Sequence, residues 1–182
     1  MTATEHVLIL LSLVISLALA HVLNGIARLV HAENVAWSRI HLVWIVIALL
    51  MLVDFWMSAW QLRHEDDWNI LMVLFWMTMA VLFYLICALM VPDTIPNEGI
   101  DLSDFHETNR RRYLGLFLFT MLFSFTANLT LSGFATANVI VVLNAFCLAA
   151  AGFSKSMKIQ WAGTIGTSIL FVVYFAIFMS DF

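Results

Sequence analysis

The chain has 182 residues, of which 63% are hydrophobic and 11% charged, with a formal net charge of −4 and a mean hydropathy of +0.98. A soluble domain of this size cannot bury so much apolar surface, so the composition excludes that class and predicts a polytopic membrane protein. Cys87 and Cys147 both fall inside apolar runs, which argues against structural disulfides and indicates free buried thiols.

Six apolar runs are long enough to cross a bilayer, which takes about 20 residues each. They cover roughly residues 6–30, 40–61, 69–91, 113–132, 134–153 and 159–180. The first run is expected to stay in the protein and not to be cleaved as a signal peptide, because MTATEH before it has no Lys or Arg and carries Glu5. We therefore expect an all-α fold in which residues 1–182 form one six-helix transmembrane domain.

The first run contains a polar stripe within the segment HVLNGIARLVH. At 100° per residue, His21, Asn24 and Arg28 share one side of the helix. Arg28 lies near the membrane interface, where an arginine can snorkel to the headgroups, whereas His21 lies about 10 Å deeper. At that depth His21 and Asn24 should face protein or water. Two interpretations stay open for them, an interhelical hydrogen bond and a polar pathway.

Ser12 and Ser16 lie on the opposite side of the same run, four residues apart. Small residues at this spacing let two membrane helices approach each other closely. We therefore expect this side of the first helix to serve in helix packing.

Asp54 is the only carboxylate inside a predicted span, in the segment LLMLVDFWMSAWQL. It lies in the outer half of the second run, about 10 Å below that surface, and Ser58 follows one turn later on the same face. An acid within the membrane is a functional-site hypothesis by default, because a charged carboxylate is costly there. The alternative is structural, with a protonated Asp54 that hydrogen-bonds a neighbouring helix.

Polar side chains also recur every four residues along the fourth and sixth runs. They are Thr120, Ser124 and Asn128 in the fourth run and Gln160, Thr164 and Ser168 in the sixth, with Asn144 in the fifth. Such stripes more often serve helix packing and helix-to-helix hydrogen bonds than ion conduction. Ser124, Asn128 and Asn144 are nevertheless candidates for a polar pathway. Asn128 is expected at the depth of Asp54 and Asn144 near that of His21, and Ser124 and Asn144 would bridge the two depths.

Lysine and arginine residues are concentrated on one side of the predicted spans. Seven flank the first, third and fifth connections, and Arg63 alone lies on the other side. The seven are Arg28, Arg39, Arg110, Arg111, Arg112, Lys155 and Lys158. By the positive-inside rule these connections are cytoplasmic and both termini lie on the non-cytoplasmic side. The arginines are expected to contact anionic lipid headgroups.

The longest connection, residues 92–112, contains Asp104-Phe105-His106-Glu107. Asp and Glu at this spacing form a capping box, which predicts a helix that begins there and runs into the fourth span. The connection is also the surface we would assign to a partner protein. Its acidic residues and single histidine lack the spacing of a metal site. Three arginines beside a membrane give no reason to expect a nucleic acid partner.

Several functional classes lack their motifs. Both lysines lie at the cytoplasmic margin, which argues against a retinal Schiff base, and no channel filter, voltage sensor, P-loop or GxSxG motif occurs. No enzymatic activity and no cofactor are therefore predicted. Haem would need paired histidines at one depth, and such edge pairs keep a haem- or quinone-binding redox subunit as an alternative. The pairs are His31 with His41, and His6 with His64.

The pieces LNGIARLV, FWMSAW and HETNRRRYLGL resemble small bacterial membrane proteins over about the first 120 residues. The resemblance is consistent with a bacterial inner membrane, which would make the termini periplasmic. It implies no activity.

We expect a channel or transporter for protons or small ions, with Asp54, His21 and Asn24 along its polar pathway. A 20.6 kDa unit of six helices has little room for a pore of its own, so a homo-oligomer is expected. The main alternative is a non-transporting membrane scaffold or sensor subunit that binds a partner. Lipid is the surrounding medium in every case.

Overall fold

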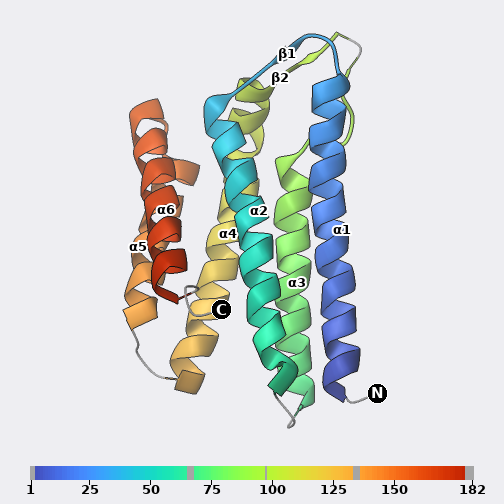
Figure 1. Ribbon diagram of the computed structural model, residues 1–182. Helices are drawn as coiled ribbons and strands as arrows, with labels where there is room; N and C mark the ends of the chain where they lie inside the picture. Colours follow the sequence, from blue (N-terminus) through green and yellow to red (C-terminus); the bar gives the residue numbers. More distant parts are fainter. Residues whose placement is uncertain (1–2, 65–67, 97, 133–135, 179–182) are drawn as a thin grey trace. The chain divides into compact units, whose positions relative to one another are not determined.

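The computed structural model describes residues 3–64, 68–96, 98–132 and 136–178 (Figure 1). Within them the α-helices are α1 (Ala3–His31), α2 (Arg39–Gln61), α3 (Ile70–Met90), α4 (Leu102–Ser132), α5 (Thr136–Phe153) and α6 (Met157–Phe178). A 3₁₀ turn, Leu62–His64, follows α2. Strands β1 (Val35–Ala36) and β2 (Ile100–Asp101) form a short parallel pair. The described part of the chain is thus almost wholly helical, and the expected all-α class is confirmed.

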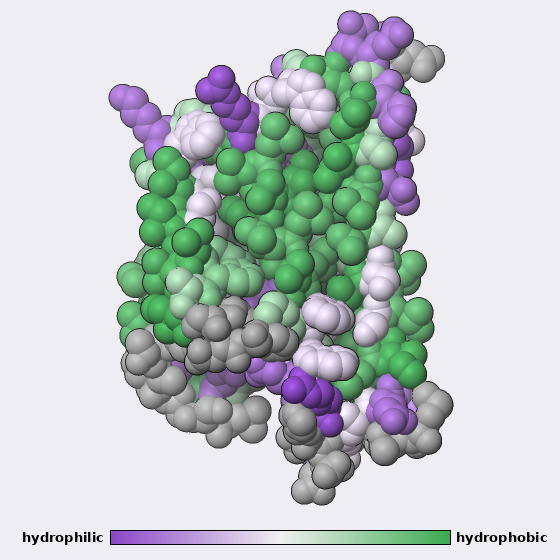
Figure 2. Space-filling model, viewed as in Figure 1, coloured by the Kyte–Doolittle hydropathy of each residue, from purple (hydrophilic) through white to green (hydrophobic). Residues whose placement is uncertain are grey.

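Five of the helices are long and apolar enough to cross a membrane, namely α1, α2, α3, α4 and α6. The apolar stretch Asn138–Phe153 in α5 is shorter. Large hydrophobic side chains are exposed on these helices, among them Leu71, Phe146 and Val172. On the face in Figure 2, hydrophobic residues cover the middle of the helices and hydrophilic residues gather near their ends. Such a surface suits lipid and not water, as the composition predicts.

The chain divides into two compact units, one up to Asn109 and one from Arg110 onward. Helix α4 begins in the first unit and continues in the second. In the first unit α1 packs against both α3 and α2, and in the second α5 packs against α6. The expected single domain stays a prediction.

In the first unit, α1, α2 and α3 enclose an apolar core. Phe55 of α2 is buried, with its ring centroid 4.9 Å from that of Phe83 of α3. The starts of α1 and α3 are tied together, because Trp68 Nε1 donates a hydrogen bond of 2.9 Å to Thr4 Oγ1. Asn69 caps α3 by accepting a backbone N–H from its first turn. At this end of the unit, the hydrogen bond between Trp68 and Thr4 therefore joins two helices whose starts are distant in the sequence.

At the other end of the first unit, two connecting segments pair as β1 and β2, with Val35 opposite Ile100. The turn before β2 requires glycine, because Gly99 has a φ of +99° and a Cβ there would collide with the backbone oxygen of Asn34. Strands of two residues are too short to show an alternating pattern, so the sequence did not predict them.

Helix α4 begins at Leu102, before the predicted capping box. Asp101 caps it, because its Oδ1 accepts the backbone N–H of Ser103 over 2.7 Å. The prediction that Asp104 starts the helix is therefore wrong by a few residues. The expectation that one helix runs from this connection into the fourth span is confirmed, since α4 is continuous to Ser132.

Candidate functional site

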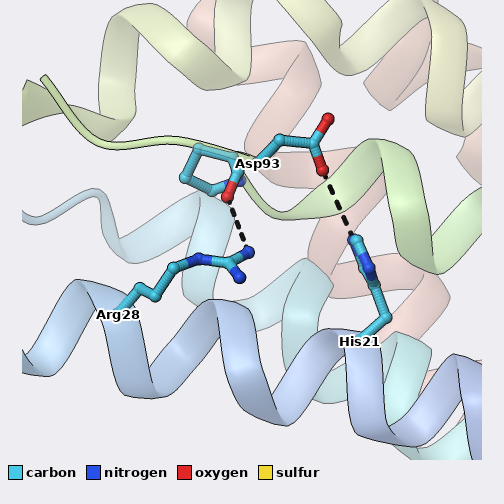
Figure 3. A network of polar contacts seen from close by, with 4 residues as sticks. His21, Arg28 and Asp93 are labelled. Atoms are coloured by element: carbon cyan, nitrogen blue, oxygen red, sulfur yellow. Dashed lines mark hydrogen bonds and ion pairs between the residues drawn. The ribbon is translucent and has the colours of Figure 1, made fainter.

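The segment that follows α3 lies along one face of α1 (Figure 3). Spacings of four and three residues place His21, Gly25 and Arg28 on this face. Arg28 Nη2 donates a hydrogen bond of 3.1 Å to the carbonyl oxygen of Pro92. A Cβ added to Gly25 would lie 2.6 Å from the Cβ of Val91, so only glycine allows this approach. The segment Val91–Asp93 is thereby held along α1, and we call it the α1-bound segment.

The same segment places Asp93 beside His21. Asp93 Oδ1 lies 3.9 Å from His21 Nε2, an ion pair when the imidazole is protonated. The Asp93 side chain is 83% exposed and that of His21 only 23%. The Nε2 atom itself is buried, and no described residue hydrogen-bonds it. The pair therefore joins an open carboxylate to a shielded imidazole nitrogen, with the ring of Tyr84 edge-on at 6.3 Å from that of His21.

The other members of the predicted stripe behave differently. Asn24 is exposed, so it does not share the buried position of the His21 ring nitrogen. His31 is also exposed, and its Nδ1 lies 2.7 Å from the Ala27 oxygen of its own helix. Arg28 was expected to reach lipid headgroups, whereas its guanidinium contacts the chain's own backbone at Pro92.

Asp54 is half-buried in α2. Its Oδ1 is shielded from solvent, and it has no hydrogen-bond partner among the described residues. Ser58, one turn later, is half-buried as well. The described contacts do not join Asp54 to His21, so a shared cavity stays a prediction. The structure thus leaves a carboxylate oxygen inside an apolar helix without a described donor, which is a costly arrangement unless a proton or water satisfies it.

A buried histidine pair lies near the β1–β2 ladder, and sequence reasoning missed it. The rings of His41 of α2 and His106 of α4 have centroids 5.7 Å apart, and both side chains are almost fully buried. Phe105 packs edge-on against His41 at 5.4 Å. Helical spacing could have indicated that His106 is buried, because the buried residues Leu102, His106 and Arg110 recur every four residues.

Of the two edge pairs proposed for haem, the structure describes both side chains only for His31 with His41. His41 packs against His106 and not against His31, which bonds to its own helix. The side chain of His64 lies outside the described residues. In the described parts of the chain no group of three or more His, Cys, Asp or Glu residues is arranged to hold a metal ion.

In the second unit, Arg110 caps the end of α5. Its Nη1 donates to the carbonyl oxygens of Ala151 and Gly152, both at 2.9 Å, and its Nη2 donates to Ser154 at 2.8 Å. A buried cation at this position satisfies carbonyls that lack helical partners and complements the negative end of the helix dipole. Arg110 is therefore bound within the protein and is not a headgroup residue. Arg39, Arg111 and Arg112 are exposed, and their headgroup contacts stay a prediction.

The remaining pathway candidates belong to the second unit. Asn144 of α5 and Thr167 of α6 are buried, and their side-chain oxygens have no hydrogen-bond partner among the described residues. Ser124 is half-buried and Asn128 is exposed. The neighbouring hydroxyls of Thr120, Thr164 and Ser168 each donate to a backbone oxygen four residues earlier in their own helix, so these bonds are not the expected helix-to-helix hydrogen bonds. Gly163 and Gly166 let α6 lie directly against Cys147 of α5.

No protein-family model, no curated protein and no solved structure matches this chain. A function therefore has to be argued from the side chains themselves. The His21–Asp93 pair and Asp54, both in the first unit, are titratable groups within or beside the apolar helices.

Proposed function

We propose that the protein moves protons across a membrane, with the His21–Asp93 pair and Asp54 as the groups that bind the proton in turn. The observation that carries this proposal is the position of Asp93, an open carboxylate 3.9 Å from a shielded nitrogen of His21. Imidazole and carboxylate groups exchange protons readily near neutral pH. An exposed acid beside a buried base is therefore a suitable entry to a proton path.

The route continues from His21 toward the outer half of the first unit. The ring of Tyr84 lies edge-on to that of His21, and a phenol can both donate and accept a hydrogen bond. Asp54 is the next titratable group along the helices, and its buried Oδ1 has no described donor. A proton needs only a chain of hydrogen-bonding groups and waters, so the route requires no pore wide enough for a hydrated ion.

The membrane arrangement that we propose has six spans, with α5 as the fifth. The Lys/Arg distribution favours cytoplasmic first, third and fifth connections and termini on the non-cytoplasmic side. With the resemblance of the first 120 residues, this supports a bacterial inner membrane with periplasmic termini. We infer a homo-oligomer, because six helices enclose little space of their own. Asp93 and His21 would then take up protons from the cytoplasmic side.

The test is proton flux into liposomes that contain the purified protein and a pH-sensitive dye, driven by a potassium gradient with valinomycin. The wild-type protein should acidify or alkalinise the lumen faster than empty liposomes do. Asp54→Asn and His21→Ala should each lower the rate by about tenfold or more, because each removes a group that must bind the proton. Asp93→Asn should also lower the rate, because the shielded Nε2 of His21 then loses the neighbouring carboxylate that would pass protons to it.

Matched controls keep the test specific. His31→Ala removes an exposed histidine of the same helix, and Asp104→Asn removes an exposed acid, so both should retain the wild-type rate. A wild-type rate equal to that of empty liposomes would overturn the proposal. Equal losses in Asp54→Asn and His21→Ala and in the controls His31→Ala and Asp104→Asn would also overturn it, since they would show a general loss of folded protein.

A second candidate is a non-transporting module that binds a partner through the connection from residue 92 onward. The observation that favours it is a set of exposed carboxylates on this stretch, which are Asp93, Glu98, Asp101, Asp104 and Glu107. A basic protein segment would complement them. Crosslinking in native membranes should then capture one protein whose recovery falls in Asp101→Lys and Asp104→Lys but persists in Asp54→Asn.

A further inference from the structure

A groove runs between α1 and α2 in the first unit. Its volume is about 430 Å³, and it lies along about 12 Å of α1 between Leu8 and Ser16. The lining residues are Leu8, Ile9, Ser12, Leu13, Ser16, Trp56, Ala59 and Trp60. Ser12 and Ser16 were expected to bring another helix close. In this structure they line an open groove, because their small side chains leave the space unfilled.

The groove has an aromatic and a charged margin on α2. The rings of Trp56 and Trp60 stack with centroids 6.2 Å apart. The guanidinium of Arg63 lies 5.1 Å from the centroid of Trp60, within range of a cation–π contact. The contact with Trp60 places Arg63 at the end of the groove. Arg63 is also the only Lys or Arg between residues 40 and 109.

A carboxylate continues the groove on α1. At 100° per residue, Glu5, Ser12 and Ser16 fall within about 40° of one another around the helix. Glu5 is exposed and lies one turn before Leu8. Among the described residues, this end of the apolar groove therefore has the cation Arg63 on the α2 side and the anion Glu5 on the α1 side.

We propose that this groove binds one phospholipid molecule with an ethanolamine headgroup. An acyl chain lies over Ser12 and Ser16 between the helices, and the phosphate contacts Arg63. The ammonium group of the headgroup faces Glu5. Tryptophan rings such as Trp60 belong at this depth, where the apolar membrane core meets the headgroups. The site is separate from the proposed proton path and does not depend on it.

Charge favours a phospholipid over a protein helix as the occupant. A partner helix or a second copy of the chain would also cover the apolar floor, but it would not require paired opposite charges at one end. A guanidinium matches a phosphate in geometry and charge, and it retains its charge at the membrane surface. Ser12 and Ser16 form the bottom of this shallow groove. A flexible acyl chain can follow its shape, whereas the side chains of a helix would leave gaps in it.

Native mass spectrometry of the detergent-purified protein tests the proposal. The probes are palmitoyl-oleoyl phosphatidylethanolamine, the matching phosphatidylglycerol and the matching diacylglycerol, each titrated separately. The wild-type chain should retain one phosphatidylethanolamine, bind phosphatidylglycerol no more tightly, and bind diacylglycerol about tenfold more weakly. Arg63→Gln should weaken both phospholipids by about tenfold and leave diacylglycerol unchanged. Glu5→Gln should weaken only phosphatidylethanolamine.

Matched variants separate a built site from general lipid affinity. Arg39→Gln removes an exposed arginine at the other end of α2, and it should leave the binding unchanged. Ser12→Leu combined with Ser16→Leu fills the groove and should abolish the adduct. Ala20→Leu adds the same bulk to an exposed position of α1 outside the groove and should not.

Three results would overturn the proposal. The first is equal lipid loss in Arg63→Gln and Arg39→Gln, and the second is an adduct that survives filling of the groove. The third is a dimer that Ser12→Leu with Ser16→Leu dissociates while no lipid is bound, since the occupant would then be a second copy. Tighter binding of phosphatidylglycerol than of phosphatidylethanolamine would overturn the assignment of the headgroup. Circular dichroism of each variant verifies that the helices are retained.

Discussion

His21 Nε2 and Asp93 Oδ1 lie 3.9 Å apart, which joins the middle of α1 to the segment that follows α3. The contact depends on the backbone around it and not on the two side chains alone. Gly25 lets Val91 approach α1, and Arg28 holds the carbonyl of Pro92.

Gly25→Ala should displace the α1-bound segment, because the new Cβ would lie 2.6 Å from the Cβ of Val91. We expect the free energy of unfolding to fall by about 1–3 kcal/mol, although alanine favours the helix itself. Thermal unfolding in detergent measures the change. Gly115→Ala is the matched control, because its nearest neighbour would be an ordinary 3.7 Å from the new Cβ. Equal effects of the two substitutions would contradict the packing described at Gly25.

Arg110→Gln should destabilise the second unit, because three backbone oxygens at the end of α5 lose their donor. We expect a loss of about 3 kcal/mol, the scale for breaking buried hydrogen bonds to a charged group. Unfolding with increasing mole fractions of a denaturing detergent measures it. Arg111→Gln changes an exposed neighbour and should have almost no effect. If both variants behaved alike, Arg110 would not be the cap of α5.

Gly99→Ala should open the β1–β2 pair, because its φ of +99° disfavours a side chain and the added Cβ would meet the Asn34 backbone. The amide of Ile100 donates to the Asn34 oxygen over 3.3 Å. Hydrogen exchange at that amide should therefore accelerate by about tenfold or more, while amides in the middle of α3 keep their protection. Unchanged exchange at Ile100 would show that the turn does not need glycine.

Thr167→Val tests the buried hydroxyl that lacks a described partner. Replacing it should leave stability unchanged or raise it by about 1 kcal/mol, because no hydrogen bond is lost and a polar group leaves the interior. Thr164→Val is the comparison, since Thr164 Oγ1 donates to the Gln160 oxygen over 2.9 Å, and it should be destabilising. Loss of stability in Thr167→Val would instead point to a bound water or ion at that hydroxyl.

The boundaries of the helices followed from local sequence. The predicted runs 40–61 and 69–91 match α2 (Arg39–Gln61) and α3 (Ile70–Met90) closely, because a break in hydrophobicity ends each helix. The fourth run began too late, since the polar residues from Leu102 onward continue the same helix and hydropathy alone does not include them. Sequence also identified His21 and Asp54 as unusual, because polar groups stand out in an apolar run.

The partners of those residues did not follow from local sequence. In the sequence, Asp93 looks like any acidic loop residue, and Arg110 does not differ from the two arginines after it. The fold places Asp93 beside His21 and Arg110 at the end of α5. Likewise, His41 and His106 show no spacing that links them, and the groove beside Ser12 and Ser16 exists only where α1 meets α2.

The membrane class, the helices and the positions of polar groups within the apolar runs could all be predicted from the amino-acid sequence. Those features depend on composition and on neighbours within about one helical turn, which the sequence contains directly. The packing of the helices was needed to show that His21 faces Asp93, that Arg110 caps α5 and that Arg63 lies at the end of a groove. The first two contacts join residues far apart in the chain, and the groove lies between two helices, so all three depend on how whole helices pack.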